Sequence, residues 1–487
     1  MQLDAFHDIG LDNASLARLL SDHDATTLPR LERFWAYYRN EMTPRSSTTR
    51  WAAWGRNGSC DSTSRAYRLA QEAGLPERYC GSIDDRAGPR REVVIENDIA
   101  WRVQSMIDFL LGKPLRITST ARDEKLRDTI TRVLDRVWER SGGIALLQDM
   151  ALLGHVYGYV DLLVRVGDNL RGGGSASGTL DRALAAAEEI RIEVIEPTRG
   201  IALLNTGDYR EIDAYVLRLT SEPPAAKPGA QPPPQRLEII SRDAWQVFDG
   251  DTLAAEHPLP APGVLPVVHI QNIAQPFEYP GMSEVEPLIP LQDELNTRLS
   301  DRAQRVTFQS FRMWLAKGID GFDKGPVGPG AVWSTDNPDA SITVFGGDAD
   351  SPSETAHIRE IRDALDKIST VPPIASGVVQ AKIGNLSSAN ALRITLMGVL
   401  AKTARKQVTY GAGLSRVCEI VLAALDHAGV LPTQTADRGV RLTWPDPLPE
   451  DPRDQAAAAE SKVRLGVPAA VLRDELGYEP TDPGITG

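Results

Sequence analysis

The residues best suited to a chemical task lie between Ile374 and Ala428, where the sequence carries six basic residues and two acidic ones. The acidic residues are Glu419 and Asp426, and the basic ones are Lys382, Arg393, Lys402, Arg405, Lys406 and Arg416. Cations spaced along a segment can contact the phosphates of a nucleic acid without reading its sequence. The same charges would suit the solvated face of a helix, and the pattern leaves both interpretations open.

Motifs for catalysis or metal binding are missing from the sequence. It contains no HExxH, GxSxG or Walker A motif and no GxGxxG after a strand. The glycine-rich stretch 172–178 lacks the lysine of a phosphate-binding loop, so its composition indicates a connector. The histidines show no ligand spacing, and the apolar neighbours of His155 and His269 favour core residues over ligands. We expect no catalytic residue, metal or cofactor, although a hydrolase with unpatterned carboxylates stays an alternative.

Length and composition describe a folded protein with more than one domain. Its 487 residues exceed what one hydrophobic core usually organises. No run of eighteen apolar residues suggests a membrane span, and the first residues do not resemble a secretory signal. Three cysteines without CxxC spacing fit a reducing compartment, although Cys60 and Cys80 could meet in space.

The overall charge is acidic, with a formal net charge of −13. This balance argues against a protein that grips nucleic acid through many phosphate contacts. It is compatible with a surface that DNA slides past, because an acidic surface repels phosphates. Solubility is the simpler reason for such a charge, and the composition does not separate the two.

The element that would position these residues begins with a helical pattern from Ser283 to about Phe308. Some 26 residues would make a rod of roughly 39 Å. Ser283 is a candidate N-cap, and Glu286 would complete a capping box, while Pro287 and Pro290 disturb the first turns. The pattern predicts either a core helix with a solvated face or a strut that packs against copies of itself. The apolar stripe consists of Val285, Leu288, Leu291, Leu295, Leu299, Ala303 and Val306.

Further elements follow from periodicity and from breaks in the chain. Helices are predicted near 28–42, 95–111, 122–140 and 144–156, and alternating strands of an antiparallel sheet between residues 158 and 247. Residues 320–353 would form two small strands, at 330–333 and 342–345, that cannot bury a core alone. Further strands are predicted at 265–270 and 440–444. A second helix, 354–370, ends at Val371-Pro372-Pro373, a third runs from Ser387 or Ser388 to Ala428, and helices are predicted near 452–465 and 468–476. The predicted fold class is α+β.

Three consecutive stretches resemble the entry to the stem in portal proteins of tailed bacteriophages, particularly the family typified by the portal of phage SPP1. They are Pro266-Val267-Val268-His269-Ile270-Gln271-Asn272, Gly281-Met282-Ser283-Glu284-Val285-Glu286-Pro287-Leu288-Ile289 and Leu291-Gln292-Asp293-Glu294-Leu295-Asn296. Similar segments lie near residues 30–116, 148–165, 190–311 and 355–480. The resemblance therefore covers most of the chain and rests on the order of many weak matches.

The resemblance implies a portal fold with long stem and wing helices, an antiparallel β region in the wing, a small β clip and a helical C-terminal crown. Its parts would be the wing 1–280, first stem helix 281–315, clip 316–353, second stem helix 354–372, tunnel loop 373–387, long wing helix 388–428, and crown and C-terminal tail 429–487.

The resemblance also implies roles for individual residues. The tunnel loop would project into a DNA channel and carry Ser376, Val378, Val379, Gln380, Lys382 and Asn385. Basic residues facing DNA or a neighbouring subunit would be Arg393, Lys402, Arg405 and Lys406. The stem would use Arg298, Arg302 and Arg305, and the clip would make contacts through Trp333 and Phe345.

The implied function is a ring of twelve subunits at one capsid vertex, through which the genome is packaged and ejected. Double-stranded DNA would pass non-specifically, and ATP would be hydrolysed by a separate terminase. Expected partners are the terminase large subunit, a head-completion or adaptor protein, and the major capsid and scaffold proteins, with no membrane. The protein would assemble in the bacterial cytoplasm and reside in the virion. The alternative is a capsid or head-tail structural protein without a channel.

Overall fold

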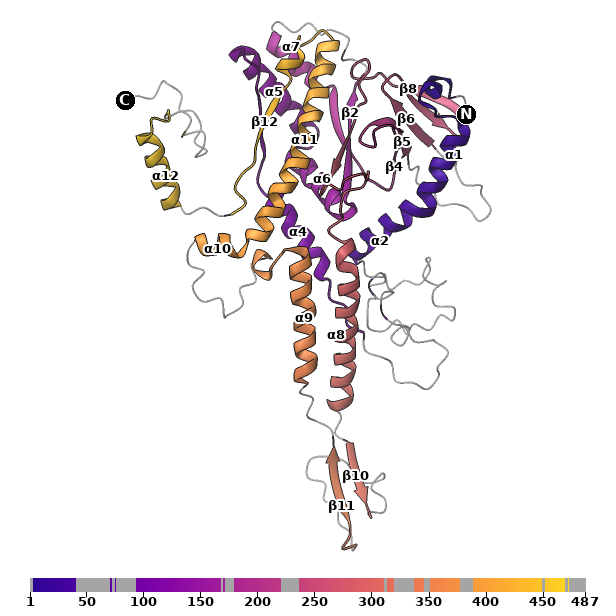
Figure 1. Ribbon diagram of the computed structural model, residues 1–487, viewed down its shortest axis with the longest axis vertical. Helices are drawn as coiled ribbons and strands as arrows, with labels where there is room; N and C mark the ends of the chain where they lie inside the picture. The colour runs from indigo at the N-terminus through magenta and orange to yellow at the C-terminus, as the bar shows by residue number, and fades with distance from the viewer. Residues whose placement is uncertain are drawn as a thin grey trace.

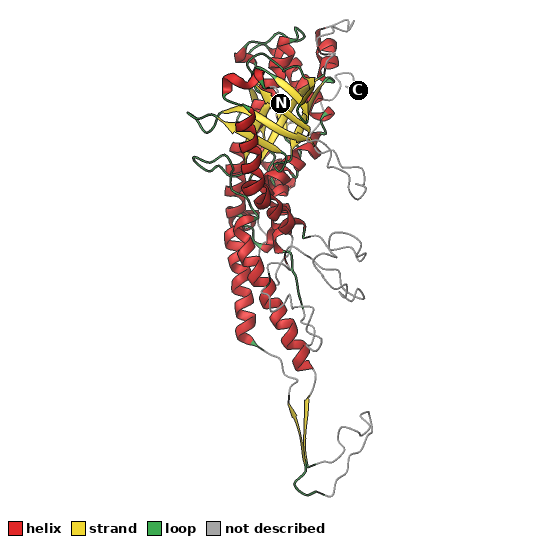
Figure 2. Cartoon of the chain, turned by 90° about the vertical axis from the view of Figure 1, so that its right-hand side faces the viewer, coloured by secondary structure: helices red, strands yellow, loops and turns green. Residues whose placement is uncertain are grey.

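The computed structural model describes residues 3–40, 71, 75, 93–167, 170, 179–219, 236–310, 313–318, 337–345, 351–376, 389–448, 452–468 and 472. The fold is α+β with antiparallel sheets, as predicted. A head of helices and sheets forms one end, and a pair of long helices leads away from it to a β-hairpin (Figure 1). The view turned by 90° shows the same elongated shape (Figure 2).

Four helical segments lie between residues 4 and 39, and a side chain caps the second of them. Residues Asp4–Ile9 form a short 3₁₀ helix, α1 spans Asn13–Asp22, a π-helical turn covers His23–Thr27, and α2 spans Leu28–Arg39. The N-cap of α1 is Asp12, whose carboxylate accepts from the Ser15 N–H over 2.7 Å. Leu31, Phe34 and Tyr37 form the buried side of α2.

Three helices precede the sheets, close to their predicted positions. They are α4 (Asp98–Leu111), α5 (Glu124–Arg140) and α6 (Gly143–Tyr157). The Asn97 side chain caps α4, and Gly158 ends α6 with a φ of 92°, which favours glycine. A further short helix, α7, covers Thr179–Ala187.

Two larger antiparallel sheets form the β region of the head. The three-stranded sheet has the order β3-β2-β9, with β2 at Tyr159–Val166, β3 at Ile190–Ile195 and β9 at Val267–Gln271. The five-stranded sheet runs in order from β4 to β8. Its strands are β4 (Gly200–Leu204), β5 (Ile212–Leu219), β6 (Arg236–Ser241), β7 (Trp245–Asp249) and β8 (Thr252–Glu256).

The sequence of strand β5 is apolar at successive positions because the strand lies between two cores. Ala214 and Val216 pack with Phe6 and Leu11 of the N-terminal segment, on one face of the five-stranded sheet. Tyr215 and Leu217 point to the opposite face, toward Leu163 and Val267 of the three-stranded sheet. Both faces of the strand are therefore buried, and alternation places consecutive apolar side chains in two different cores.

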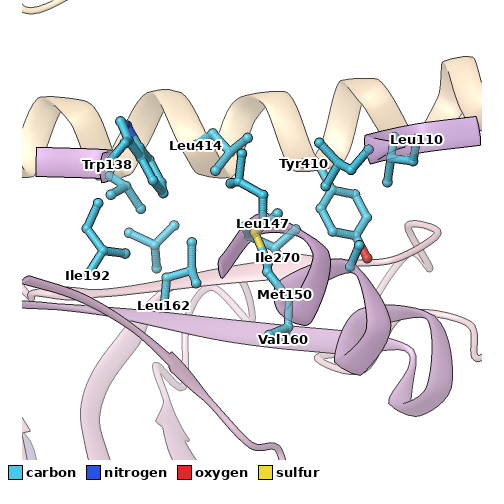
Figure 3. Packing of buried hydrophobic residues seen from close by; sticks show 14 of the residues in the cluster. Leu110, Trp138, Leu147, Met150, Val160, Leu162, Ile192, Ile270, Tyr410 and Leu414 are labelled. Carbon is cyan, nitrogen blue, oxygen red and sulfur yellow. The ribbon is translucent and has the colours of Figure 1, made fainter. Parts of the chain in front are cut away.

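The long helix α11 (Met397–His427) is the spine of the main core. Tyr410 and Leu414 reach from it toward Leu147, Met150 and Ile270, as Figure 3 shows. A Cβ at Gly413 would come within 2.3 Å of Ile270, so the close approach of α11 to β9 requires glycine. This helix is long and apolar enough to cross a membrane, but most of its apolar stretch is buried in the head, as in a core helix.

The helix predicted from residue 388 to Ala428 is interrupted. The structure has a short helix, α10 (Ala389–Thr395), followed by a turn at Leu396 and then α11. Leu396 has φ −94° and ψ 8°, which lies outside the helical region. Two β-branched residues, Ile394 and Thr395, and the nearby Gly398 are poor helix formers and weaken the helix at this point.

Two smaller sheets and a last helix complete the described fold. Strand β1 (Arg116–Ser119) pairs with β12 (Val440–Thr443), which confirms the strand predicted at 440–444. Strand β11 (Ser341–Phe345) confirms the second small strand, and it pairs with β10 (Met313–Lys317). The other strand predicted there, at 330–333, lies outside the described residues. Helix α12 covers Pro452–Arg464.

Candidate functional site

The two helices that leave the head form what we call the strut: α8 (Ile289–Ser310) and α9 (Pro352–Ser369). They lie side by side in both views (Figures 1 and 2). Ile358, Ile361 and Leu365 form the buried stripe of α9, and Leu295 is fully buried on α8. Farther from the head, Arg305 of α8 pairs with Glu354 of α9. The predicted pair of helices is confirmed.

The start of the strut is capped differently from the prediction. The Ser283 hydroxyl accepts from the N–H groups of Val285 and Glu286, at 3.0 and 3.3 Å. The first helical turn begins only at Glu286, with Val285 as its N-cap, so the prediction that Ser283 is the N-cap is wrong. The predicted capping box is wrong, because the Glu286 carboxylate instead accepts from the Arg30 guanidinium of α2 at 2.7 and 3.0 Å. A 3₁₀ turn at Glu286–Leu288 then leads into α8, consistent with the disturbance expected from Pro287.

One face of α8 carries three buried polar side chains, Gln292, Asn296 and Ser300, each fully buried. Each accepts a hydrogen bond from a backbone N–H of the segment that runs beside the helix. Asp98 donates to Gln292 over 2.9 Å, Glu96 to Asn296 over 3.0 Å and Val94 to Ser300 over 3.0 Å. We call this set of contacts the ladder.

The hydrogen bonds of the ladder form at successive positions because an extended chain and an α-helix have nearly the same repeat distance. Alternate residues of an extended chain lie about 6.6 Å apart and present their N–H groups to the same side. Residues four apart on an α-helix rise about 6 Å and share a face. Side chains of α8 therefore satisfy backbone groups that a neighbouring strand would otherwise satisfy. The Asn296 amide also donates to Gln71 over 3.1 Å, and Gln71 in turn donates to the Tyr37 carbonyl of α2.

Three buried charged side chains meet where the strut joins the head: Glu284, Lys402 and Lys406. We call them the junction cluster. The Lys402 ammonium donates to Glu284 over 2.5 Å and to the Ser369 carbonyl at the end of α9 over 3.0 Å. Lys406 forms an ion pair with the other Glu284 oxygen over 2.7 Å. Lys402 thus connects α11 to the beginning of one strut helix and the end of the other.

Burial and mutual charge set the protonation of the junction cluster. Burial alone would raise the pKa of Glu284, but the charges of Lys406 and Lys402 outweigh it and lower the pKa to about 2. Burial lowers the pKa of Lys406 to about 8, against the attraction of Glu284. Near neutral pH, the cluster therefore holds two cations and one anion away from water.

His155 lies beside this cluster in the interior of the head. Burial, followed by the charge of Lys406, lowers the pKa of His155 well below its ordinary value, so the ring is neutral. Its Nδ1 atom bonds to the Ala151 carbonyl over 2.6 Å, and its Nε2 atom has no hydrogen-bond partner among the described residues. The prediction of a core histidine is confirmed at this position.

A second polar group fixes the loop that leads to the strut. The buried Asp161 carboxylate accepts from Tyr215 over 2.7 Å and from Tyr279 over 3.1 Å, and it lies 2.7 Å from Nδ1 of His269. The other His269 nitrogen lies 2.8 Å from the Tyr279 carbonyl. His269 is therefore a satisfied structural residue, as predicted, and Asp161 connects both large sheets to the loop before α8.

The predicted basic residues of the last wing helix separate into two groups. The prediction that Lys402 and Lys406 face DNA or a neighbouring subunit is wrong, because both are buried with Glu284 inside their own chain. Arg393 is half-exposed and pairs with Asp446 over 2.6 Å. Arg405 is exposed. The structure thus leaves the two arginines at the surface.

The predicted tunnel-loop residues fall mostly outside the described residues. Ser376 is exposed, and its hydroxyl donates to the Pro373 carbonyl over 2.8 Å. The structure does not describe the other members of this set, which are Val378, Val379, Gln380, Lys382 and Asn385.

The predicted stem and clip residues are placed in part. Arg298 bonds Glu294 and Asp301 of its own helix at 2.7 and 2.9 Å, and Arg302 is exposed. Arg305 joins the two strut helices, as described above. Phe345 lies opposite Met313 in the hairpin register, and Trp333 is outside the described residues.

The ladder and the junction cluster were not predicted from the sequence. Gln292, Asn296 and Ser300 recur every fourth residue, and this period could have indicated a polar face turned toward another segment. The junction cluster has no such local signal, because Glu284 lies 118 residues from Lys402. Within the described residues, no group of histidine, cysteine or carboxylate side chains could hold a metal ion.

Chains in two solved particle structures are similar to this chain over most of its length. No curated protein matches the chain. A chain in the virion of a native gene transfer agent particle is 16% identical, with a TM-score of 0.41, over 79% of this chain and 90% of that one. A chain in the neck of an empty gene transfer agent particle is 14% identical, with a TM-score of 0.44, over 79% and 91%.

The family comparison extends over nearly the whole sequence. The model of the family described as "Phage portal protein, SPP1 Gp6-like" matches residues 18–473. This range contains the strut, the hairpin, the ladder and the junction cluster, and it agrees with the resemblance of the stretches around Ser283. The chain therefore belongs to the SPP1 Gp6-like family of phage portal proteins.

Proposed function

We propose that this chain is a portal subunit whose copies form a closed ring around a DNA channel at one capsid vertex. The genome would be packaged and later ejected through this ring. The channel would act passively or as a gate, while a separate terminase hydrolyses ATP. Family membership supports the proposal, and the strut is the structural observation that carries it.

We expect the strut and its hairpin to be stabilised by neighbouring subunits, because an isolated subunit gives them little support. The hairpin β10–β11 forms a two-stranded sheet at the end of the strut, away from the head (Figure 1). A two-stranded hairpin is marginally stable by itself in water. Leu315 in β10 is 58% exposed. Neighbouring copies in a ring would pack against Leu315 and the other hairpin side chains that the described part of the chain leaves exposed.

The parts of the molecule take roles in this proposal. The head up to residue 280 is the wing, 281–315 and 354–372 are the stem, 316–353 is the clip and 373–387 is the tunnel loop. Residues 388–428 are the long wing helix, and 429–487 form the crown and tail. The clip would meet the terminase large subunit and later an adaptor protein, and the outer surface would meet capsid and scaffold proteins. We propose twelve copies in the ring and a place in the virion.

Electron microscopy of the purified protein tests the proposal. Closed rings with a central hole as wide as a DNA duplex are expected. A chain that stays monomeric at every concentration would refute it. Assemblies without a central hole would favour the alternative, a capsid or head-tail structural protein that forms no channel.

A further inference from the structure

An exposed apolar stripe follows one side of α10 and α11. Three of its members are large side chains with high exposure: Ile394 at 73%, Met397 at 66% and Val408 at 72%. Between them lie Ala401 and Ala404, which are also exposed. We call these five residues the seam. Within α11, Met397, Ala401, Ala404 and Val408 recur at spacings of four, three and four residues, as on a helix that packs against another helix. Ile394 precedes them on α10, before the turn at Leu396.

The opposite side of the same helix is already occupied by its own chain. Val399, Lys402, Thr403 and Lys406 are buried there. The seam therefore lies on the side of α11 that faces away from the core. Isolated apolar side chains on a surface are common, but Met397 and Val408 lie on one face of α11 with the exposed Ala401 and Ala404 between them, and together they form a patch.

Helix α12 is also exposed. Nearly every described side chain of α12 is exposed, including Val463 at 57%. In Figure 1, α10 and α12 stand away from the head on the same side of the molecule. A helix of 13 residues is marginal in water without packing. This side of the subunit thus presents two helices with little packing against their own chain.

The charge beside the seam is positive. Arg405 lies on the exposed side, and no carboxylate occurs in the sequence between Arg393 and Arg416. Arg393 and Arg416 themselves pair with Asp446 and Glu419 of their own chain. The chain as a whole carries a net charge of −13, so the surface of another copy is on average acidic. DNA would complement Arg405 but leave three large apolar side chains in water. A second copy complements the charge and also covers the apolar side chains.

We propose that the seam is the surface through which one subunit packs against the next copy in the ring. The inference rests on the proposed function and names the contact on which the ring depends. The contact is heterologous: the seam of one copy meets a different surface of its neighbour, which allows a ring to close. Arg405 lies next to the apolar residues and helps to select an acidic partner surface.

Two single substitutions test the seam, each placing a carboxylate in it: Met397→Glu and Val408→Glu. Both positions are exposed in the subunit, so folding should be little affected. Leu253→Glu in β8 is the matched control, because Leu253 is a large apolar residue with 50% exposure that lies outside the seam. The mass of the assembly is measured against protein concentration by light scattering, with circular dichroism and thermal melting to check folding.

The two seam variants should need about tenfold more protein, or higher, to assemble, because a buried carboxylate opposes the contact. Leu253→Glu should assemble like the wild type. Wild-type assembly by both seam variants would overturn the inference while leaving the proposed ring intact. Rings that assemble normally but lose retention of DNA would show that the seam contacts DNA instead. A monomeric wild type would overturn the proposed function itself.

Discussion

The backbone N–H of Glu96 donates to the side-chain oxygen of Asn296 over 3.0 Å, in the middle of the ladder. Asn296→Ala removes this acceptor and leaves the N–H group without its partner. We expect a loss of about 1–3 kcal/mol in the free energy of unfolding, measured by urea denaturation. Arg302→Ala on the exposed side of the same helix is the control and should change it by no more than about 0.5 kcal/mol. Equal effects would mean that the ladder adds no stability.

Glu284→Gln removes the only carboxylate of the junction cluster and leaves two lysines buried without a counter-charge. The expected cost is about 3–5 kcal/mol, since an unpaired buried charge is strongly destabilising. Glu419→Gln is the matched control, because it removes a carboxylate that pairs with Arg416 over 2.8 Å on the surface. It should cost no more than about 1 kcal/mol. The test is the difference between the unfolding midpoints of Glu284→Gln and Glu419→Gln.

Lys406→Met should change how stability depends on pH. The folded-state pKa of Lys406 is about 8, below its ordinary value of 10.5, so the unfolded chain binds more protons between these values. Stability from this group therefore rises as the pH increases from 8 to 10.5, and its cost is fully present below pH 8. Relative to Lys406→Met, the wild type should gain stability across that window. Parallel curves for the two proteins would contradict the assignment.

Gly158→Ala should be severely destabilising for two separate reasons. Gly158 has a φ of 92°, and a Cβ there would lie 2.4 Å from the Gly281 carbonyl oxygen. Gly263→Ala separates the two effects, because Gly263 has a φ of 68° with open space around it. The control should cost about 1–2 kcal/mol from its backbone conformation, and Gly158→Ala distinctly more. Thermal melting compares them, and similar melting temperatures would exclude a contribution from the clash.

Lys382→Glu addresses the tunnel loop, which is proposed from the sequence alone. Reversing this charge should alter the efficiency of DNA packaging, because a cation beside the channel attracts phosphates and a carboxylate repels them. Ring assembly should stay unchanged, as judged by electron microscopy. Packaging at the wild-type level would remove Lys382 from the mechanism.

Local periodicity was enough to predict much of the fold. The strut helices, β2, β9 and β12 all appear near their predicted positions, because apolar spacing and proline breaks act over a few residues. Boundaries were less accurate: the helix expected from Ser283 begins as a 3₁₀ turn at Glu286. The break at Leu396 was missed, although the weak helix formers around it are visible in the sequence.

The roles of charged residues were harder to predict because they depend on distant partners. Lys402 and Arg405 look alike in the sequence, yet one lies inside the head and the other is exposed. The difference is set by the direction of each side chain around α11 and by Glu284, which belongs to another part of the chain. A basic cluster in a sequence therefore does not distinguish a surface for phosphates from a buried ion pair.

The ladder has a mechanical consequence for the strut. Among the described residues, it holds α8 to residues 94–98 between Gln292 and Ser300, the part nearest the head. Farther out, α8 is supported by its partner helix and by the pair between Arg305 and Glu354. The strut is therefore a beam clamped at one end. A sideways force on the hairpin would bend the outer half of the strut. The ladder would keep the inner half from sliding along the head, so the force would be transmitted to the head.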